Sequence, residues 1–271
     1  MNIDFYTKNL IQESGIWYNN AKSTFSYPHE GNDISFQLEN NSFWFNYRNK
    51  FILAAIKNYP PDGAFFDVGG GNGFVAKEIQ DAGIEVVLVE PGENGCINAK
   101  KRNIHHVICS TLENAGFEKN TIPNIGLFDV LEHFENDIAF LEKIHSYLMK
   151  DGLLYITVPA YNMIWSAEDD HVGHFNRYTL KSLAEKLNSI GFKIPYSTYF
   201  FSILPIPIFL LRTIPGKLGL QGDSGNMKSS YQEHKDRGML LNKLWIWELN
   251  KIKHNKTIPF GGSCLMIARK K

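Results

Sequence analysis

A run of glycines between two regular elements constrains this chain of 271 residues more than any other feature. Residues 67–73 read Asp-Val-Gly-Gly-Gly-Asn-Gly; they follow an apolar segment at residues 64–68 and precede a helical pattern at residues 74–82. Glycine allows a sharp turn and a close approach of the backbone to a ligand. The amino end of the following helix offers free N–H groups and the positive end of its dipole. The sequence therefore predicts a ligand-binding turn at the end of a buried strand.

Strand-like and helix-like segments alternate after this turn. Strands are expected at residues 85–89, 107–108, 125–128, 153–158, 194–201 and 263–268, and another helix near residues 240–252. Such alternation is typical of a parallel sheet with helices on both faces. We predict a Rossmann-like, doubly wound α/β domain at residues 61–200 and 259–271, with an insertion at residues 201–258. Residues 1–60 are expected to form a helical or irregular cap, loosely structured up to residue 40.

An acidic residue stands where a nucleoside would need one. Glu90 ends the second predicted strand, about 20 residues after the turn, which is the position of an acid that binds ribose hydroxyls. The turn and this acid together indicate a nucleoside-bearing cofactor. Residues 71–76 also fit the GxGxxG/A pattern, so a nicotinamide cofactor is one alternative and a purely structural glycine turn is another.

Composition and charge exclude several classes of protein. Lys and Arg total 28, as do Asp and Glu, so no net charge attracts a nucleic-acid backbone and no nucleic-acid partner is expected. Cys96, Cys109 and Cys264 are far apart, which favours neither a disulfide framework nor a cysteine zinc site. The first residues lack the basic and apolar regions of a signal peptide, and we expect a cytoplasmic protein.

Four stretches carry a family resemblance: FFDVGGGNGF from Phe65, VVLVEPG from Val86, FDVLEHFEND from Phe128 and LMKDGLLYITVPA from Leu148. They resemble class I S-adenosylmethionine-dependent methyltransferases, in the group that includes ubiquinone-pathway and type 11/12 enzymes. A fifth stretch, GHFNRYTLKSL from Gly173, is typical of a bacterial subgroup. Asp67 supplies the first position of the Asp-x-Gly-x-Gly-x-Gly form of this family. A long segment also precedes the first strand, whereas dehydrogenases usually start there directly.

The resemblance implies S-adenosylmethionine as the cofactor, bound at the ends of the first four strands. The residues implied are Asp67, Gly69, Gly70, Gly71, Glu90, Pro91, Thr111, Leu112, Phe128 and Asp129. The first of these would contact the methionine part, Glu90 the ribose hydroxyls, and Asp129 would lie beside the sulfonium. Thr111 stands where the family often has an acid for the adenine amine, so we expect a contact through backbone or water there. The family's last strand is antiparallel, which we expect here as well.

The loops after the fourth and fifth strands hold the candidates for acceptor chemistry. A base is needed only where the acceptor is a protonated hydroxyl or amine, and the catalytic candidates are His133, His171 and His174. Asp169, Arg177 and Tyr178 are the candidates for substrate binding, and Arg48 is a candidate for the donor carboxylate. The spacing of Asp169, Asp170, His171 and His174 matches no metal motif, so no metal site is predicted.

The insertion is expected to form part of the acceptor pocket or its lid, because the two strands that flank it meet the ligand-binding edge of the sheet. It contains most of an apolar stretch at residues 199–211, from Tyr199 to Leu211, that is too short to span a bilayer. Core packing is the simplest interpretation of this stretch, and shallow contact with a membrane or a lipid tail is the alternative.

The sequence thus predicts methyl transfer to a small-molecule acceptor, apolar or lipid-linked. Two alternatives stay open. One is an NAD(P)-dependent oxidoreductase on a related fold, and the other is a non-catalytic module that binds S-adenosylmethionine and acts through partners.

Overall fold

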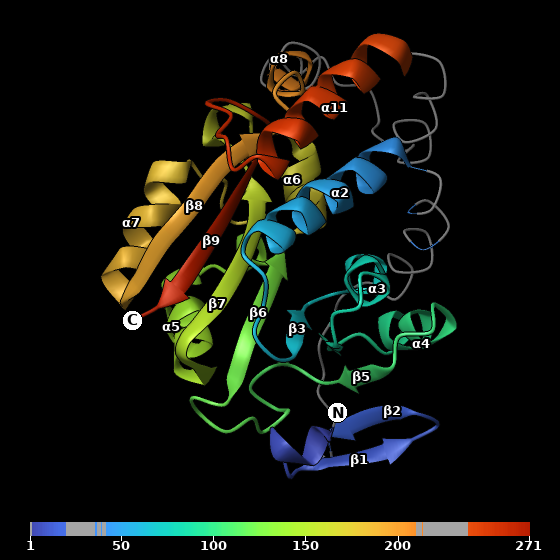
Figure 1. Cartoon of the computed structure of the whole chain (residues 1–271). Helices are drawn as coiled ribbons and strands as arrows, with labels where there is room; N and C mark the ends of the chain where they lie inside the picture. The colour runs from blue at the N-terminus through green and yellow to red at the C-terminus, as the bar shows by residue number, and fades with distance from the viewer. Residues whose placement is uncertain (1, 20–35, 37–38, 40–41, 210–212, 214–237) are drawn as a thin grey trace.

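The computed structural model describes residues 2–19, 36, 39, 42–209, 213 and 238–271. Within these residues nine strands form one sheet with the order β1-β2-β5-β4-β3-β6-β7-β9-β8 (Figure 1). The strands are β1 (Leu10–Glu13), β2 (Ile16–Asn19), β3 (Phe65–Val68), β4 (Val86–Glu90), β5 (His106–Cys109), β6 (Ile122–Phe128), β7 (Leu148–Pro159), β8 (Phe192–Phe200) and β9 (Ser263–Lys270).

The centre of the sheet is parallel and one late strand reverses. Strands β5, β4, β3, β6 and β7 pair in parallel, whereas β9 pairs antiparallel with both β7 and β8. The predicted Rossmann-like α/β fold with an antiparallel last strand is confirmed. Because β9 runs against β8, the end of β8 and the start of β9 lie at the edge where the parallel strands end. The insertion between them therefore emerges at the ligand-binding edge.

Helices cover both faces of this sheet (Figure 1). They are α2 (Phe43–Asn58), α3 (Phe74–Asp81), α4 (Glu93–Lys101), α5 (Asp137–Tyr147), α6 (Ala167–Val172), α7 (Leu180–Ile190), α8 (Pro205–Ile208) and α11 (Gly238–Lys253), with short 3-10 turns η1 (Ile3–Phe5), η2 (Leu131–His133) and η3 (Asn162–Ile164). Consecutive strand residues point to opposite faces, so Phe66 packs in the core beneath α5 and α7, and Phe65 packs beneath α2 and α3.

The N-terminal segment departs from the expectation. Residues 10–19 form a β-hairpin, β1 and β2, whose second strand joins the sheet in parallel with β5. The prediction of an irregular or loosely helical segment is wrong there. The hairpin turns at Ser14 and Gly15, which both have positive φ values, 51° and 79°. Such a two-residue turn matches the twist of paired strands, although Ser-Gly is a weaker signal than Asn-Gly.

The described part of the insertion packs against the N-terminal helix. The ring of Trp245 on α11 stacks on Phe43 of α2 with centroids 4.5 Å apart. The buried carboxylate of Glu248 accepts hydrogen bonds from the amides of Phe201 and Ser202, each at 2.8 Å. The helix predicted near residues 240–252 is confirmed. Among the described residues no helix combines the length and apolarity that a membrane span requires.

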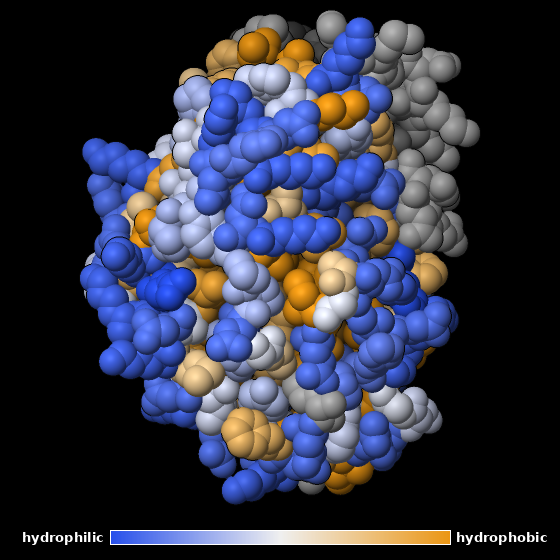
Figure 2. Space-filling view, in the orientation of Figure 1, coloured by the Kyte–Doolittle hydropathy of each residue, from blue (hydrophilic) through white to orange (hydrophobic). Residues whose placement is uncertain are grey.

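The apolar stretch at residues 199–211 divides into a buried and an exposed part. Tyr199, Phe200 and Phe201 are buried, whereas Ile203 and Ile206 are 38% and 57% exposed. Figure 2 shows hydrophobic side chains gathered at the upper end of the molecule, where α8 lies in Figure 1. Leu210 and Leu211 lie outside the described residues. Core packing therefore accounts for the first three residues of the stretch.

Candidate functional site

The glycine turn connects β3 to α3 at the carboxyl edge of the sheet. Gly69 and Gly71 have φ values of +70° and +53°, and a Cβ added at Gly71 would meet no atom of the described residues within 4 Å. Gly70 is crowded instead, because a Cβ there would lie 2.2 Å from Leu88 Cδ1 and 2.6 Å from Asp67 Oδ2. The turn is thus open at Gly71, where a ligand can approach the backbone closely, and tightly packed at Gly70.

Asp67 lies directly beneath this turn. It is 1% exposed, and neither carboxylate oxygen has a hydrogen-bond partner of standard geometry among the described residues. Burial raises the pKa of Asp67 to about 7, against the lowering effect of Arg48 and of the Ala76 amide, while Glu90 adds to the increase. A buried carboxylate without partners is costly unless a ligand supplies them. Asp67 therefore marks a position suited to a cationic group.

Glu90 ends β4 beside the turn and is also buried. Its Oε2 accepts a hydrogen bond from the Gly71 amide at 2.9 Å, and its Oε1 accepts one from the Gly92 amide at 2.8 Å. Burial raises the pKa of Glu90, and these two hydrogen bonds lower it. The carboxylate is fixed in direction, and each oxygen keeps a lone pair for a further donor such as a hydroxyl.

The other residues predicted for the cofactor lie at the same edge and pack into the fold. Pro91 follows Glu90 and is half-buried, and Leu112 is in the core. The Thr111 hydroxyl accepts a hydrogen bond from the Asn114 amide at 3.1 Å, and Phe128 stacks in parallel on a neighbouring core ring. Their contacts with a cofactor stay predictions.

Arg48 from α2 reaches the end of β6. Its Nε lies 2.6 Å from Asp129 Oδ2, and its Nη2 donates to the Phe128 carbonyl at 2.9 Å. The Thr157 hydroxyl donates to Asp129 Oδ1 at 3.0 Å. Arg48 is thus paired with Asp129, whereas the sequence assigned it to the donor carboxylate. Its charge also lowers the pKa of Asp67 and of Glu132, so one guanidinium is shared among several carboxylates.

Two of the three candidate histidines meet. The rings of His133 and His174 lie 4.8 Å apart with their planes inclined at 70°. Burial lowers the pKa of His133 and the nearby His174 lowers it further, so the ring is neutral at neutral pH. His171 is exposed on α6 and takes no part in this pair.

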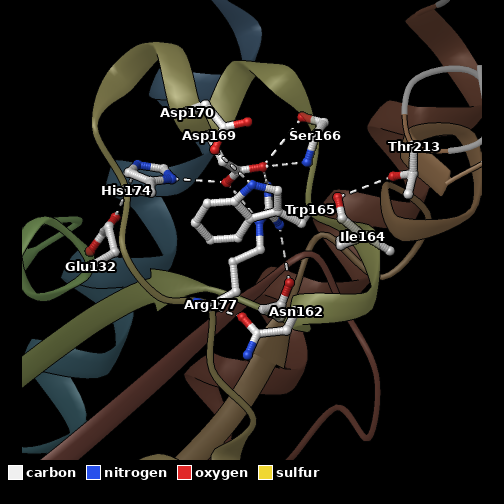
Figure 3. A network of polar contacts seen from close by, with 11 residues as sticks. Glu132, Asn162, Ile164, Trp165, Ser166, Asp169, Asp170, His174, Arg177 and Thr213 are labelled. Atoms are coloured by element: carbon white, nitrogen blue, oxygen red, sulfur yellow. Dashed lines mark hydrogen bonds and ion pairs between the residues drawn. The ribbon is translucent and has the colours of Figure 1, made fainter. Parts of the chain in front are cut away.

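A network centred on Asp169 supports the pair (Figure 3). Asp169 Oδ1 lies 2.9 Å from His174 Nδ1 and accepts from Arg177 Nε at 2.7 Å. Asp169 Oδ2 accepts from the Ser166 amide at 2.8 Å and from Arg177 Nη2 at 3.1 Å. Although burial alone would raise its pKa, the hydrogen bonds from His174 and Arg177 lower the pKa of Asp169 to about 2. Asp169 is therefore an ionised support for the side chains around it.

Tyr178 lies deeper than predicted for a substrate contact. It is 2% exposed, and its hydroxyl donates to Asp137 Oδ2 at 2.8 Å. This position favours a structural role. Asp169 and Arg177 are likewise bound to each other, so their contact with a substrate stays a prediction.

Sequence reasoning missed Glu132. This residue is 1% exposed, directly precedes His133, and directs its Oε1 toward His174 Nε2 at 3.9 Å. Burial and the charge of Asp129 raise the pKa of Glu132 well above its usual range. The available signal was an acid beside a candidate histidine in the stretch FDVLEHFEND. His174 lies 42 positions after Glu132 and comes close to it only in the fold.

Comparison with known proteins agrees with this geometry. The family model described as a methyltransferase domain matches residues 39–196, which is more than half of the chain. A search of curated proteins found no significant match.

Solved structures of methyltransferases share the fold. A chain from the complex between the Haloferax volcanii Trm112 methyltransferase activator and a methyltransferase is 11% identical, with a TM-score of 0.59 over 90% of this chain and 97% of that chain. An S-adenosylmethionine-dependent methyltransferase of Thermotoga maritima is 14% identical, with a TM-score of 0.57 over 88% of this chain and 94% of that chain. Phosphoethanolamine N-methyltransferase 2 of Haemonchus contortus is 16% identical, with a TM-score of 0.55 over 91% of this chain and 58% of that chain. The chain belongs to the methyltransferase domain family, with the class I fold of S-adenosylmethionine-dependent methyltransferases.

Proposed function

We propose that this protein transfers a methyl group from S-adenosylmethionine to a small-molecule acceptor at the carboxyl edge of its sheet. The observation that carries the proposal is Asp67, a buried carboxylate whose two oxygens have no partner of standard geometry in the described chain. S-adenosylmethionine carries an ammonium group and a sulfonium, and such cations satisfy carboxylates of this kind.

Asp67, the glycine turn and Glu90, which we call the donor half of the site, fit this cofactor. Asp67 would pair with its ammonium group, and Glu90 would accept hydrogen bonds from its ribose hydroxyls. The bare backbone at Gly71 allows the close approach that both contacts need. When bound, the cofactor supplies an activated methyl group and a neutral thioether as the leaving group. The protein's own contribution is then to orient the acceptor and to exclude water.

The acceptor half is formed by the residues around His133 and His174, which we propose to activate the acceptor. His133 follows β6 beside Asp129, whereas His171 is exposed on α6 and is not included. A neutral imidazole offers a lone pair, either to a proton of the acceptor or to a metal ion that binds the acceptor.

The acceptor is proposed to contain an apolar part. Aromatic side chains support this: Tyr161 stacks on Tyr199 at 5.2 Å and on Phe260 at 5.3 Å, and Phe260 is 41% exposed. The insertion reaches the same region, where the Thr213 hydroxyl donates to the Ile164 carbonyl at 3.1 Å (Figure 3). Residues 201–258 are thus proposed as a wall or lid of the acceptor pocket. Ile203 and Ile206, which are exposed, are proposed as the residues for contact with lipid, whereas the buried rings of residues 199–201 are not.

Calorimetric titration of the full chain with S-adenosylhomocysteine and, separately, with NADH tests the donor assignment. We expect micromolar binding of S-adenosylhomocysteine alone, weakened about tenfold or more in Asp67→Asn because the pairing with the ammonium group is lost. Glu78→Gln on the exposed face of α3 is the matched control and should leave the affinity unchanged.

Binding of NADH alone would overturn the proposal in favour of a nicotinamide enzyme. Donor binding with no methyl transfer to any of a broad panel of hydroxyl and amine acceptors would favour a non-catalytic module instead.

A further inference from the structure

Three side chains with metal-ligating groups converge in the acceptor half. Glu132 and His133 belong to η2, and His174 follows α6. One ligand atom from each of the three lies within 4.8 Å of the other two. Carboxylate and imidazole ligands about 2.0–2.2 Å from one ion lie roughly 3–3.5 Å apart in a tetrahedral arrangement. Small side-chain shifts of about 1 Å would therefore bring all three into one coordination sphere.

Glu132 gives an independent indication of a missing partner. It is 1% exposed, and its Oε2 has no hydrogen-bond partner among the described residues. Its other oxygen faces His174 Nε2 at 3.9 Å, beyond hydrogen-bond distance. The charges of Arg48 and Arg177 and a hydrogen bond from its own backbone amide lower its pKa, but Arg48 donates to the Phe128 carbonyl and Arg177 to Asp169. A buried carboxylate with one oxygen unpaired is costly, and a cation between Glu132 and the two imidazoles would reduce that cost.

The orientation of His174 matches that of a metal ligand. Its Nδ1 is held by Asp169 at 2.9 Å, which turns Nε2 toward Glu132 (Figure 3). Asp169 is itself fixed by Arg177 and by the Ser166 amide. Histidines that bind metals usually donate their second nitrogen to a carboxylate in this manner, which fixes the tautomer and the direction of the ring.

We infer that Glu132, His133 and His174 bind a divalent transition-metal ion that in turn holds an oxygen atom of the methyl acceptor. This inference, which goes against the sequence expectation of no metal site, rests on the proposed function for its second half. Two imidazoles and one carboxylate suit Zn²⁺, Mn²⁺, Fe²⁺ or Co²⁺ better than Mg²⁺ or Ca²⁺, and three protein ligands leave positions for substrate.

The site lies beside Asp129, at the end of β6 where the family resemblance puts the sulfonium. The implied substrate class is therefore a hydroxyl compound. On binding to the metal, the hydroxyl would lose its proton to solvent at neutral pH. A lone pair of the resulting oxyanion would form the new O–C bond to the donor methyl group. The S–C bond would break at the same time, leaving its electron pair on a neutral thioether sulfur.

Metal titration of the chelator-treated full chain tests the site directly. We expect one Zn²⁺ per chain by calorimetry, and visible absorption bands of a nitrogen-coordinated ion when Co²⁺ is used. Glu132→Gln and His174→Asn should each weaken Zn²⁺ binding by about 100-fold or more. His171→Asn, on the exposed side of α6, is the matched control and should bind Zn²⁺ as the parent chain does. Circular dichroism confirms that each variant is folded.

Two further measurements separate this inference from the proposed function. S-adenosylhomocysteine should bind Glu132→Gln with the same affinity as the parent chain. If neither the parent chain nor the variant binds S-adenosylhomocysteine, the proposed methyltransferase function fails and the metal site does not. Acetohydroxamate, a small oxygen-donor ligand, should change the Co²⁺ bands because the ion keeps open positions. Equal Zn²⁺ affinity in Glu132→Gln, His174→Asn and the parent chain would overturn the metal site, and unchanged Co²⁺ bands would overturn the binding of an acceptor oxygen.

Discussion

The donor half and the acceptor half of this site are built in different ways. The donor half consists of Asp67, the glycine turn and Glu90, which come from the ends of two adjacent parallel strands. The acceptor half brings together η2 after β6, the segment around α6, and the start of the insertion. One half depends on local geometry, whereas the other depends on contacts between segments far apart in the chain.

The two halves also treat buried charge differently. Asp67 is buried with no hydrogen-bond partner of standard geometry among the described residues, and burial raises its pKa to about 7. Asp169 is equally buried, but His174 and Arg177 lower its pKa to about 2 in spite of burial. A carboxylate with unpaired oxygens can accept hydrogen bonds from a ligand, whereas a fully paired one holds its neighbouring side chains in place. Burial of an acid therefore does not by itself identify a binding residue; whether its oxygens have hydrogen-bond partners does.

The largest expected effect comes from the support of the acceptor half. Asp169→Ala removes the partner of both Arg177 and His174, and a buried guanidinium without its carboxylate costs about 3–5 kcal/mol of unfolding free energy. Urea denaturation measures this loss. Asp170→Ala is the control; Asp170 is exposed and accepts one hydrogen bond from Trp165, so a loss below about 1 kcal/mol is expected. If the donor half is independent, the folded variant still binds S-adenosylhomocysteine with unchanged affinity.

The second effect concerns the donor half. Glu90→Ala should weaken S-adenosylhomocysteine binding by about 100-fold, because the variant would lose the two proposed charge-assisted hydrogen bonds to the ribose together with the acceptor of the Gly71 amide. Calorimetry measures the affinity. Zn²⁺ affinity should stay the same, since Glu90 lies outside the Glu132 cluster. A fall in both affinities would show that the two halves are coupled and not independent.

The sequence predicted the donor half and most of the sheet because their signals are local. The strand, the glycines and the next helix are contiguous, and Glu90 follows at the interval of one helix and one strand. By contrast, the hairpin was missed because Ser14-Gly15 is a weak turn signal. No residue near Tyr178 in the sequence indicates that its hydroxyl bonds to Asp137. Glu132 was overlooked because its meaning depends on His174, which tertiary packing alone brings near.

A smaller effect follows from the pKa of Asp67. In the free protein its raised pKa gives a contribution to stability that is full below its ordinary value of 3.8 and is lost as the pH rises through about 7. Donor binding runs in the opposite direction, because the ammonium group pairs with the ionised form. We expect S-adenosylhomocysteine affinity to rise about tenfold between pH 6 and 8, with proton release measurable by calorimetry in two buffers of different ionisation enthalpy. In Asp67→Asn this pH dependence should disappear, and its persistence would assign the effect to another group.

The smallest expected effect tests where the donor half ends. Thr111 stands at the predicted adenine position, but its hydroxyl already accepts a hydrogen bond from the Asn114 amide. Thr111→Val keeps the shape of the side chain and removes that acceptor, so we expect a loss of about 1 kcal/mol in unfolding free energy and less than about a twofold change in S-adenosylhomocysteine affinity. Ser110 is buried beside it, and Ser110→Ala serves as a neighbouring control for packing. A tenfold loss of affinity in Thr111→Val alone would mean that the hydroxyl contacts the adenine directly, and the donor half would then extend from β4 to the end of β5.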